Sequence, residues 1–90
     1  MAIKLEINGN YFPPDDDKEK IHGVKIGDDA GIAWSDTTNE VRIIRYKDLN
    51  KKRYDLLETL QISEGKEAFR EIIFRQDNQI SKINIIIRNK

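Results

Sequence analysis

The sequence predicts an α+β domain in which an antiparallel sheet of about five or six strands carries one amphipathic helix on one face. Isoleucine dominates the apolar residues, with fifteen Ile against five Leu and two Val, and its β-branched side chain favours strands. Several segments alternate apolar and polar residues, and one segment changes to a period near 3.6. We expect the order β-β-β-β-α-β-β within a single domain spanning residues 1–90.

The first strand is expected near the N-terminus, where Ile3, Leu5 and Ile7 alternate with charged residues and therefore share one face. Residues 8–17 are expected to form a loop. They contain an Asn-Gly pair, two adjacent prolines and three adjacent aspartates, all of which disfavour regular structure.

Three further strands are expected between residues 21 and 46, joined by two short turns into an antiparallel meander. The second strand places His22 in phase with Val24 and Ile26, and the third places Ile32 and Trp34 on one face. The fourth strand covers residues 40–46. Glycines in 27–31 and small polar residues in 35–39 suit the turns between them.

A helix is expected over roughly residues 48–61, because Leu49, Leu56, Leu57 and Leu60 fall on one helical stripe. Asp48 or Asn50 is a candidate N-cap for this helix. Four of the five leucines lie in this one segment, which sets it apart from the isoleucine-rich remainder.

Residues 66–76 fit either a helix or a strand, and we favour the strand because Asp77-Asn78 suits a two-residue hairpin turn. The last strand, residues 80–88, directs Ile83, Ile85 and Ile87 to one side and Ile86 to the other. Apolar residues on both faces predict a strand in the centre of the sheet.

The chain contains no cysteine, which excludes disulfides, thiolate zinc sites and a cysteine nucleophile. No apolar run approaches the roughly 20 residues of a bilayer span, and the alternating N-terminus is unlike a signal peptide. We therefore expect a cytoplasmic protein that does not enter a membrane.

Catalytic and metal-binding patterns are weak in this sequence. His22, the single histidine, is expected to be a half-buried strand residue. Five aspartates could approach a hard cation, but their spacing matches no calcium loop, so we expect solvated loops; they are Asp15, Asp16, Asp17, Asp28 and Asp29. No nucleophile elbow or phosphate-binding loop is present. We expect no enzymatic activity, no metal and no cofactor.

Formal charge balances at zero, yet residues 1–40 carry a net −5 and residues 41–90 a net +5. Such an asymmetry can polarise a surface, but folding can equally interleave the two halves, and interleaving is our expectation.

The main function hypothesis is a protein-interaction or regulatory module, with a protein as partner and homodimerisation possible. Exposed aromatic residues would anchor such a partner, and the candidates are Tyr11, Phe12 and Trp34. The alternative is a nucleic-acid-binding domain, since six cations within twelve residues are interleaved with tyrosines. That basic and aromatic segment comprises Arg42, Arg45, Tyr46, Lys47, Lys51, Lys52, Arg53 and Tyr54.

Overall fold

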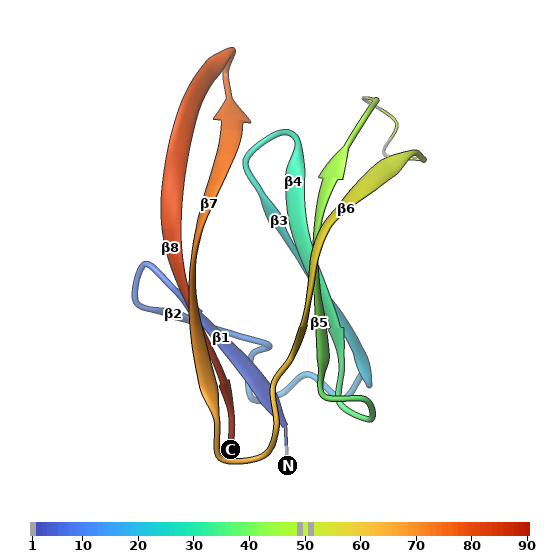
Figure 1. Cartoon of the computed structure of the whole chain (residues 1–90), viewed down its shortest axis with the longest axis vertical. Coiled ribbons are helices and arrows are strands. Elements are labelled where there is room, and N and C mark those ends of the chain that lie inside the picture. The colour runs from blue at the N-terminus through green and yellow to red at the C-terminus, as the bar shows by residue number, and fades with distance from the viewer. Residues whose placement is uncertain (1, 49, 51) are drawn as a thin grey trace.

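The computed structural model describes residues 2–48, 50 and 52–90, and within them the chain forms eight strands and no helix (Figure 1). The strands are β1 (Ile3–Ile7), β2 (Asn10–Phe12), β3 (Ile21–Ile26), β4 (Ala30–Ser35), β5 (Glu40–Tyr46), β6 (Tyr54–Gln61), β7 (Glu67–Gln76) and β8 (Gln79–Asn89). No helix in this described part of the chain is long and apolar enough to cross a bilayer.

The strands form two antiparallel sheets that lie face to face (Figure 1). Sheet A has the strand order β2-β1-β8-β7, and sheet B is the meander β3-β4-β5-β6. The chain passes from sheet A to sheet B between β2 and β3 and returns between β6 and β7. β8 then pairs with β1, so the first and last strands of the chain are neighbours in sheet A.

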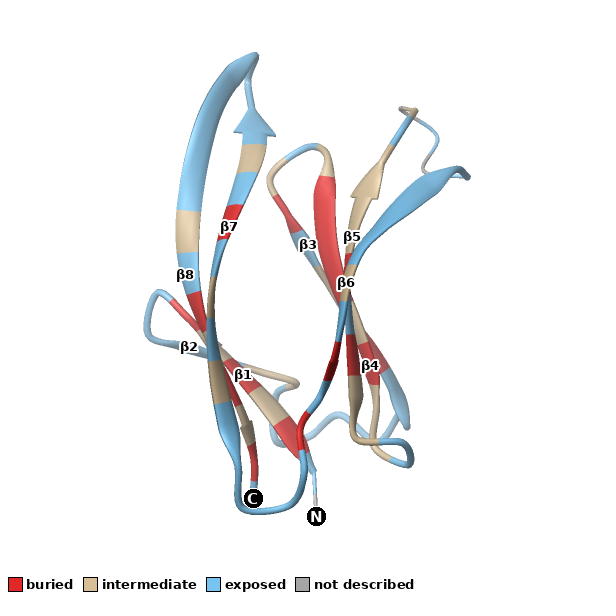
Figure 2. Ribbon diagram, in the orientation of Figure 1, coloured by how far each residue is buried: buried red, intermediate tan, exposed pale blue. Residues whose placement is uncertain are grey.

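The core lies between the two sheets and collects the inward residues of both, as the buried segments in Figure 2 show. Period-two alternation produces this arrangement: Ile3, Leu5 and Ile7 point inward from β1, with Ile85 and Ile87 beside them on β8. Sheet B contributes a second set of buried side chains, Ile26, Ala30, Ile32, Trp34, Val41, Ile43 and Leu60.

The predicted α+β class is wrong, because two packed sheets replace the sheet and covering helix. Residues 54–61 of the predicted helix form β6, while Leu49 lies outside the described residues. The backbone groups on the free side of β5 require partners, and β6 supplies them by pairing along its whole length. Tertiary pairing here overrides a local periodicity.

A β-bulge explains why the leucine spacing imitated a helix. Ile43 pairs with Glu58 and Ile44 with Leu56, so Leu57 is an additional residue without an opposite partner. The bulge shifts the alternation by one position, which lets both adjacent leucines be about half exposed while Leu60 is buried. A shifted period of two therefore resembled a period near 3.6.

The remaining strand predictions are confirmed, with one omission. Residues 67–76 are a strand, β8 lies between β1 and β7, and residues 21–46 form the expected meander. Asp77 and Asn78 have φ of 52° and 64°, as the two-residue hairpin turn requires. The short strand β2 lies within the segment that was expected to be a loop.

Candidate functional site

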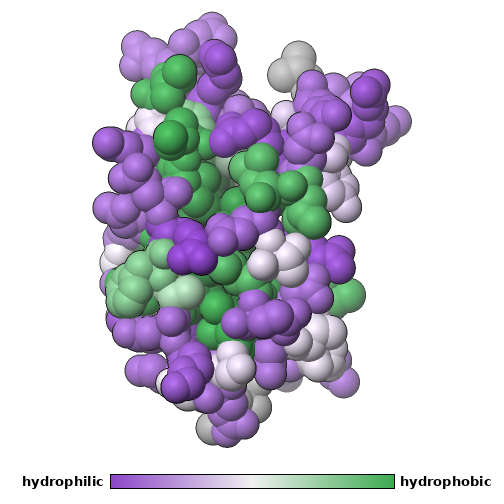
Figure 3. Space-filling view, viewed as in Figure 1, coloured by the Kyte–Doolittle hydropathy of each residue, from purple (hydrophilic) through white to green (hydrophobic). Residues whose placement is uncertain are grey.

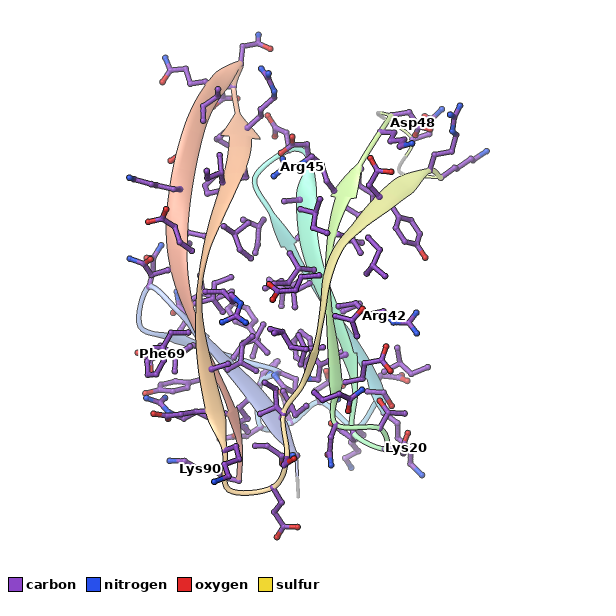
Figure 4. All side chains as sticks on the ribbon, viewed as in Figure 1. Lys20, Arg42, Arg45, Asp48, Phe69 and Lys90 are labelled. Carbon is purple, nitrogen blue, oxygen red and sulfur yellow. The ribbon has the colours of Figure 1, made fainter. Side chains whose placement is uncertain are left out.

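Most of the predicted basic and aromatic residues lie on the β5–β6 hairpin, which protrudes from the molecule. Alternation along β5 places Arg42 and Tyr46 on the outer face of sheet B, and Tyr46 pairs directly with Tyr54 of β6. Figure 4 shows Arg42 pointing away from the body of the molecule and Asp48 at the tip of the hairpin. Lys47, Lys52 and Arg53 are exposed at that end of the hairpin, and Lys51 lies outside the described residues.

Several cations of this hairpin are already paired with acids. Arg42 Nε lies 2.7 Å from Glu40 Oε1, and Lys47 Nζ lies 3.1 Å from Asp55 Oδ1. These ion pairs are solvent-exposed and therefore contribute little energy. The hairpin is thus less positive than its sequence suggests, although a phosphate could displace such weak partners.

Arg45 does not belong to this outer face, because it points between the two sheets (Figure 4). Its guanidinium donates to Asp29 Oδ2 at 2.8 Å and to the carbonyl of Ile73 on β7. Burial alone would raise the pKa of Asp29, but the N–H of Arg75 and the guanidinium of Arg45 outweigh it and lower that pKa. Arg45 therefore joins the sheets.

The aspartates considered for a cation have structural partners instead. Asp29 Oδ1 accepts from the Arg75 N–H at 2.8 Å, and Asp28 Oδ2 accepts from the Asp77 N–H at 2.9 Å. In the first acidic run, Asp15 pairs with Lys4 at 2.7 Å. In the described ranges no three His, Asp or Glu side chains gather in a way that could hold a metal ion.

The three candidate anchor residues have different surroundings. The ring of Trp34 lies in the core at 3% exposure, and Phe12 is half-buried against the same core. Tyr11 is exposed on the outer face of sheet A, where it pairs with Glu6. Of the three, Tyr11 is therefore the side chain that a partner can reach most readily.

The free edge of β6 is the surface that sequence reasoning missed. The β5–β6 ladder is bracketed by two backbone hydrogen bonds, from Lys47 N–H to the Arg53 carbonyl and from Ile62 N–H to the Asn39 carbonyl, both 2.8 Å. Antiparallel alternation then directs the backbone groups of four residues away from β5. These residues are Tyr54, Leu56, Thr59 and Gln61, and we call their outward backbone groups the β6 edge.

No described residue donates to or accepts from the β6 edge. Exposed apolar side chains accompany these groups, with Tyr54 and Leu56 each 54% exposed and Leu57 49% exposed. A long, unblocked edge strand with exposed apolar side chains is a template on which another chain can pair.

The neighbouring edge strand β7 is blocked by contrast. The Arg75 carbonyl accepts from Asp28 N–H at 2.8 Å, in addition to the bond from the Arg75 N–H to Asp29. Arg70 Nη1 donates to the carbonyl of Phe69 at 2.8 Å, and Arg45 occupies the carbonyl of Ile73. Polar groups of the chain itself thus occupy positions where a foreign strand would pair with β7.

A groove of about 260 Å³ separates the β6 edge from β7, and we call it the mouth groove. Its lining is apolar at Ile43, Leu57, Ile72 and Ile73 and charged at Arg45, Glu58, Arg70 and Glu71. Figure 3 shows apolar atoms reaching the surface between the two sheets on this face of the molecule.

One ion pair crosses the gap between β6 and β7. Arg70 Nε and Nη2 donate to the two carboxylate oxygens of Glu58 at 3.0 and 3.1 Å, and the guanidinium lowers the pKa of Glu58. Such a two-point contact has a defined geometry and fixes the width of the opening at this position. Near this ion pair, the apolar residues Leu57 and Ile73 remain about half exposed.

The histidine expected to be half-buried is almost completely buried. His22 lies between two carboxylates, with Nδ1 3.3 Å from Asp17 Oδ2 and Nε2 3.0 Å from Asp36 Oδ2. Its ring packs against Trp34 with centroids 5.3 Å apart. The sequence contained no signal for this arrangement, because the three polar residues come from separate segments.

Comparison of the chain with protein-family models, with curated proteins and with solved structures finds no significant match.

Proposed function

We propose that this protein is a non-catalytic interaction module that binds an extended segment of a partner protein along the β6 edge. The observation that carries the proposal is the contrast between the two neighbouring edge strands: polar groups of this chain, mostly from β5 and the β3–β4 turn, occupy outward backbone groups of β7, whereas no described residue occupies those of β6. Proteins usually protect their edge strands, so an open one beside exposed apolar residues favours a binding role.

The partner segment would form an additional strand of sheet B beside β6. Side chains on one of its faces would then lie over the mouth groove, against Leu57. Those on the other face would extend the outer face of sheet B beside Tyr54 and Leu56. The partner is therefore a segment with alternating apolar residues, because backbone pairing supplies affinity and alternate side chains supply specificity. A cytoplasmic location and a cytoplasmic partner remain part of this proposal.

A display library of random peptides of about 12 residues tests this proposal directly. We expect the selected peptides to alternate apolar residues and to bind the Thr59→Pro variant much more weakly. Thr59 directs its N–H outward, so proline there removes an edge donor and leaves the ladder with β5 intact. Leu57→Lys, which places a charge beside the groove, is expected to weaken binding as well.

Phe69→Lys is the matched control, because Phe69 is a similarly exposed apolar residue on β7 at 60% exposure. It lines a different depression, on the outer face of sheet A, where Figure 4 shows it pointing outward. Binding that survives Phe69→Lys and is lost in both other variants supports the β6 edge. Equal binding by all four proteins, or no selected peptides at all, contradicts the proposal.

Nucleic-acid binding is the second candidate function, favoured by the pairing of Tyr46 with Tyr54 beside the cations of the hairpin tip. The Tyr46 ring lies over sheet B, because a Cβ added at Gly31 would be 3.3 Å from its hydroxyl. Tyr54 is more exposed and is therefore the better surface for a base to stack on. The candidate predicts that labelled single-stranded DNA binds, that affinity falls steeply with salt, and that Tyr54→Ala weakens it. No change in fluorescence anisotropy at low salt would eliminate it.

A further inference from the structure

His22 occupies a position in which both ring nitrogens face a carboxylate. Its side chain is 3% exposed, and those of Asp17 and Asp36 are 26% and 31% exposed. A neutral imidazole has one N–H and one lone pair, so it can donate to only one of two ionised carboxylates. The imidazolium donates from both nitrogens. The observed geometry, with one carboxylate at each ring nitrogen, therefore matches the protonated ring.

The three residues connect three separate parts of the chain. Asp17 belongs to residues 13–20, the crossover from sheet A to sheet B, while His22 lies on β3 and Asp36 lies in the turn between β4 and β5. The Asp36 N–H also donates to the carbonyl of Lys20 at 2.9 Å, which holds the end of the crossover beside that turn. His22 thus ties the crossover to sheet B at a buried point.

The crossover has few other attachments. Residues 14–20 are all exposed, and the Lys4–Asp15 pair, an attachment to sheet A, is itself solvent-exposed. Asp17 additionally accepts the N–H of Glu19 at 2.8 Å, a bond that lies within the crossover and does not anchor it. Without apolar anchors, the position of this segment depends strongly on the contact between Asp17 and His22.

We propose that His22 is a proton-operated latch: the imidazolium holds the crossover against sheet B, and loss of its proton breaks the contact between Asp17 and His22. After deprotonation one carboxylate faces a ring lone pair, and the two repel each other. Asp17 is the partner that leaves, because its contact is the longer one and its segment is exposed. Asp36 retains the remaining N–H, since its turn is also held by the Lys20 carbonyl.

The direction of the pH dependence follows from the groups around the ring. Burial disfavours the charged form, but the hydrogen bonds and charges of Asp36 and then Asp17 outweigh it and raise the pKa of His22 above 6.5. Among the described residues, those two aspartates are the ionisable side chains that contact the ring, and β4 contributes the uncharged Trp34. The latch is therefore complete below 6.5 and opens as pH rises through the folded-state pKa.

A nitroxide spin label at Lys18→Cys tests the latch, and labelling is specific because the chain has no other cysteine. We expect an immobilised spectrum at about pH 6 and a mobile one at about pH 9. The midpoint should coincide with the titration of the His22 ring protons in NMR spectra. In Asp36→Asn that NMR midpoint should move downward, because the carboxylate charge closer to the ring is lost.

Asp17→Asn is the variant that separates the latch from a loss of folding, since Asp17 lies outside the core and the substitution preserves its shape. It should give a mobile label at both pH values while Trp34 fluorescence remains native. The same spectrum at both pH values in the unsubstituted Lys18→Cys protein overturns the proposal. So does a mobility midpoint that does not follow the His22 titration.

Discussion

At the scale of single residues, polar side chains join the two sheets at specific points. Asn89 is fully buried on β8, and its amide donates to Asn39 Oδ1 at 3.0 Å and to the Ile62 carbonyl at 2.7 Å. These acceptors lie at the β4–β5 turn and just after β6, both connected to sheet B. One side chain of sheet A thus satisfies two groups of the opposite layer, and removing it would leave a buried carbonyl unpaired.

We therefore expect Asn89→Ala to lower the free energy of unfolding by about 2 kcal/mol, measured by urea denaturation. Asn84→Ala is the control, because Asn84 lies on the same strand with an exposed side chain. Its effect should stay within about 0.5 kcal/mol. Equal effects of the two substitutions would show that the buried amide contributes no special stability.

Asp29 links the sheets in a way that depends on pH. Asp29→Asn keeps the shape of the side chain but removes the charge facing Arg45, and we expect a loss of roughly 1–2 kcal/mol at neutral pH. The folded-state pKa of Asp29 is depressed, so its contribution is present above about 3.9 and disappears as pH falls through the folded-state value. Urea midpoints of the two proteins should therefore converge in acid. If the difference between the two urea midpoints stayed constant as the pH fell, the stabilisation would not come from the charge of Asp29.

At the scale of elements, the β3–β4 turn is packed against an edge of the opposite sheet. Gly27 in this turn has φ of +58°, and a Cβ there would lie 2.2 Å from the Phe74 ring and 2.6 Å from the Arg75 carbonyl. The same turn donates from Asp28 N–H to that carbonyl. Glycine therefore allows the turn to cover β7, which is one reason that this edge is closed to other chains.

Substitution at Gly27 separates steric crowding from backbone strain. Gly65→Ala should lower the free energy of unfolding by about 1 kcal/mol, because the φ of +82° at this position is strained for alanine while the surroundings are open. Gly27→Ala should cost about 2–3 kcal/mol, since displacement of Phe74 and of the β7 backbone adds to the same strain. Thermal unfolding of both variants provides the comparison. Equal losses would mean that the turn does not pack tightly against β7.

At the scale of the whole molecule, the two sheets share one core and are expected to unfold together. Buried residues of both layers form one cluster, so neither sheet can expose its inner face without exposing the other. Trp34, the only tryptophan, reports on sheet B, and amide signals of Ile85 and Ile87 report on sheet A. Their urea midpoints should coincide. Earlier loss of the β8 amides would show that sheet A unfolds separately.

The closeness of the described cations and tyrosines of the hairpin was predictable, except at Arg45, whereas the β6 edge was not. The cations and tyrosines of residues 42–54 are adjacent in sequence, so any local structure keeps them close together. Whether the outward backbone groups of an edge strand are occupied depends instead on which strands lie at the edges of the sheets and on which residues cover them. Arg45 illustrates the difference: its contacts with Asp29 and Ile73 arise from segments far away in the sequence.

The sequence by itself determined the strands near residues 3–7, within 21–46 and near 80–88, because alternation is a local property that any sheet preserves. For residues 66–76 it only favoured a strand over a helix, on the evidence of the Asp77-Asn78 turn. Only the tertiary structure decided that residues 54–61 are a strand and that a second sheet covers the first. A strand is stabilised by backbone partners from elsewhere in the chain, whereas a helix satisfies its own. The three leucines of β6 suit either element, and pairing with β5 made the choice.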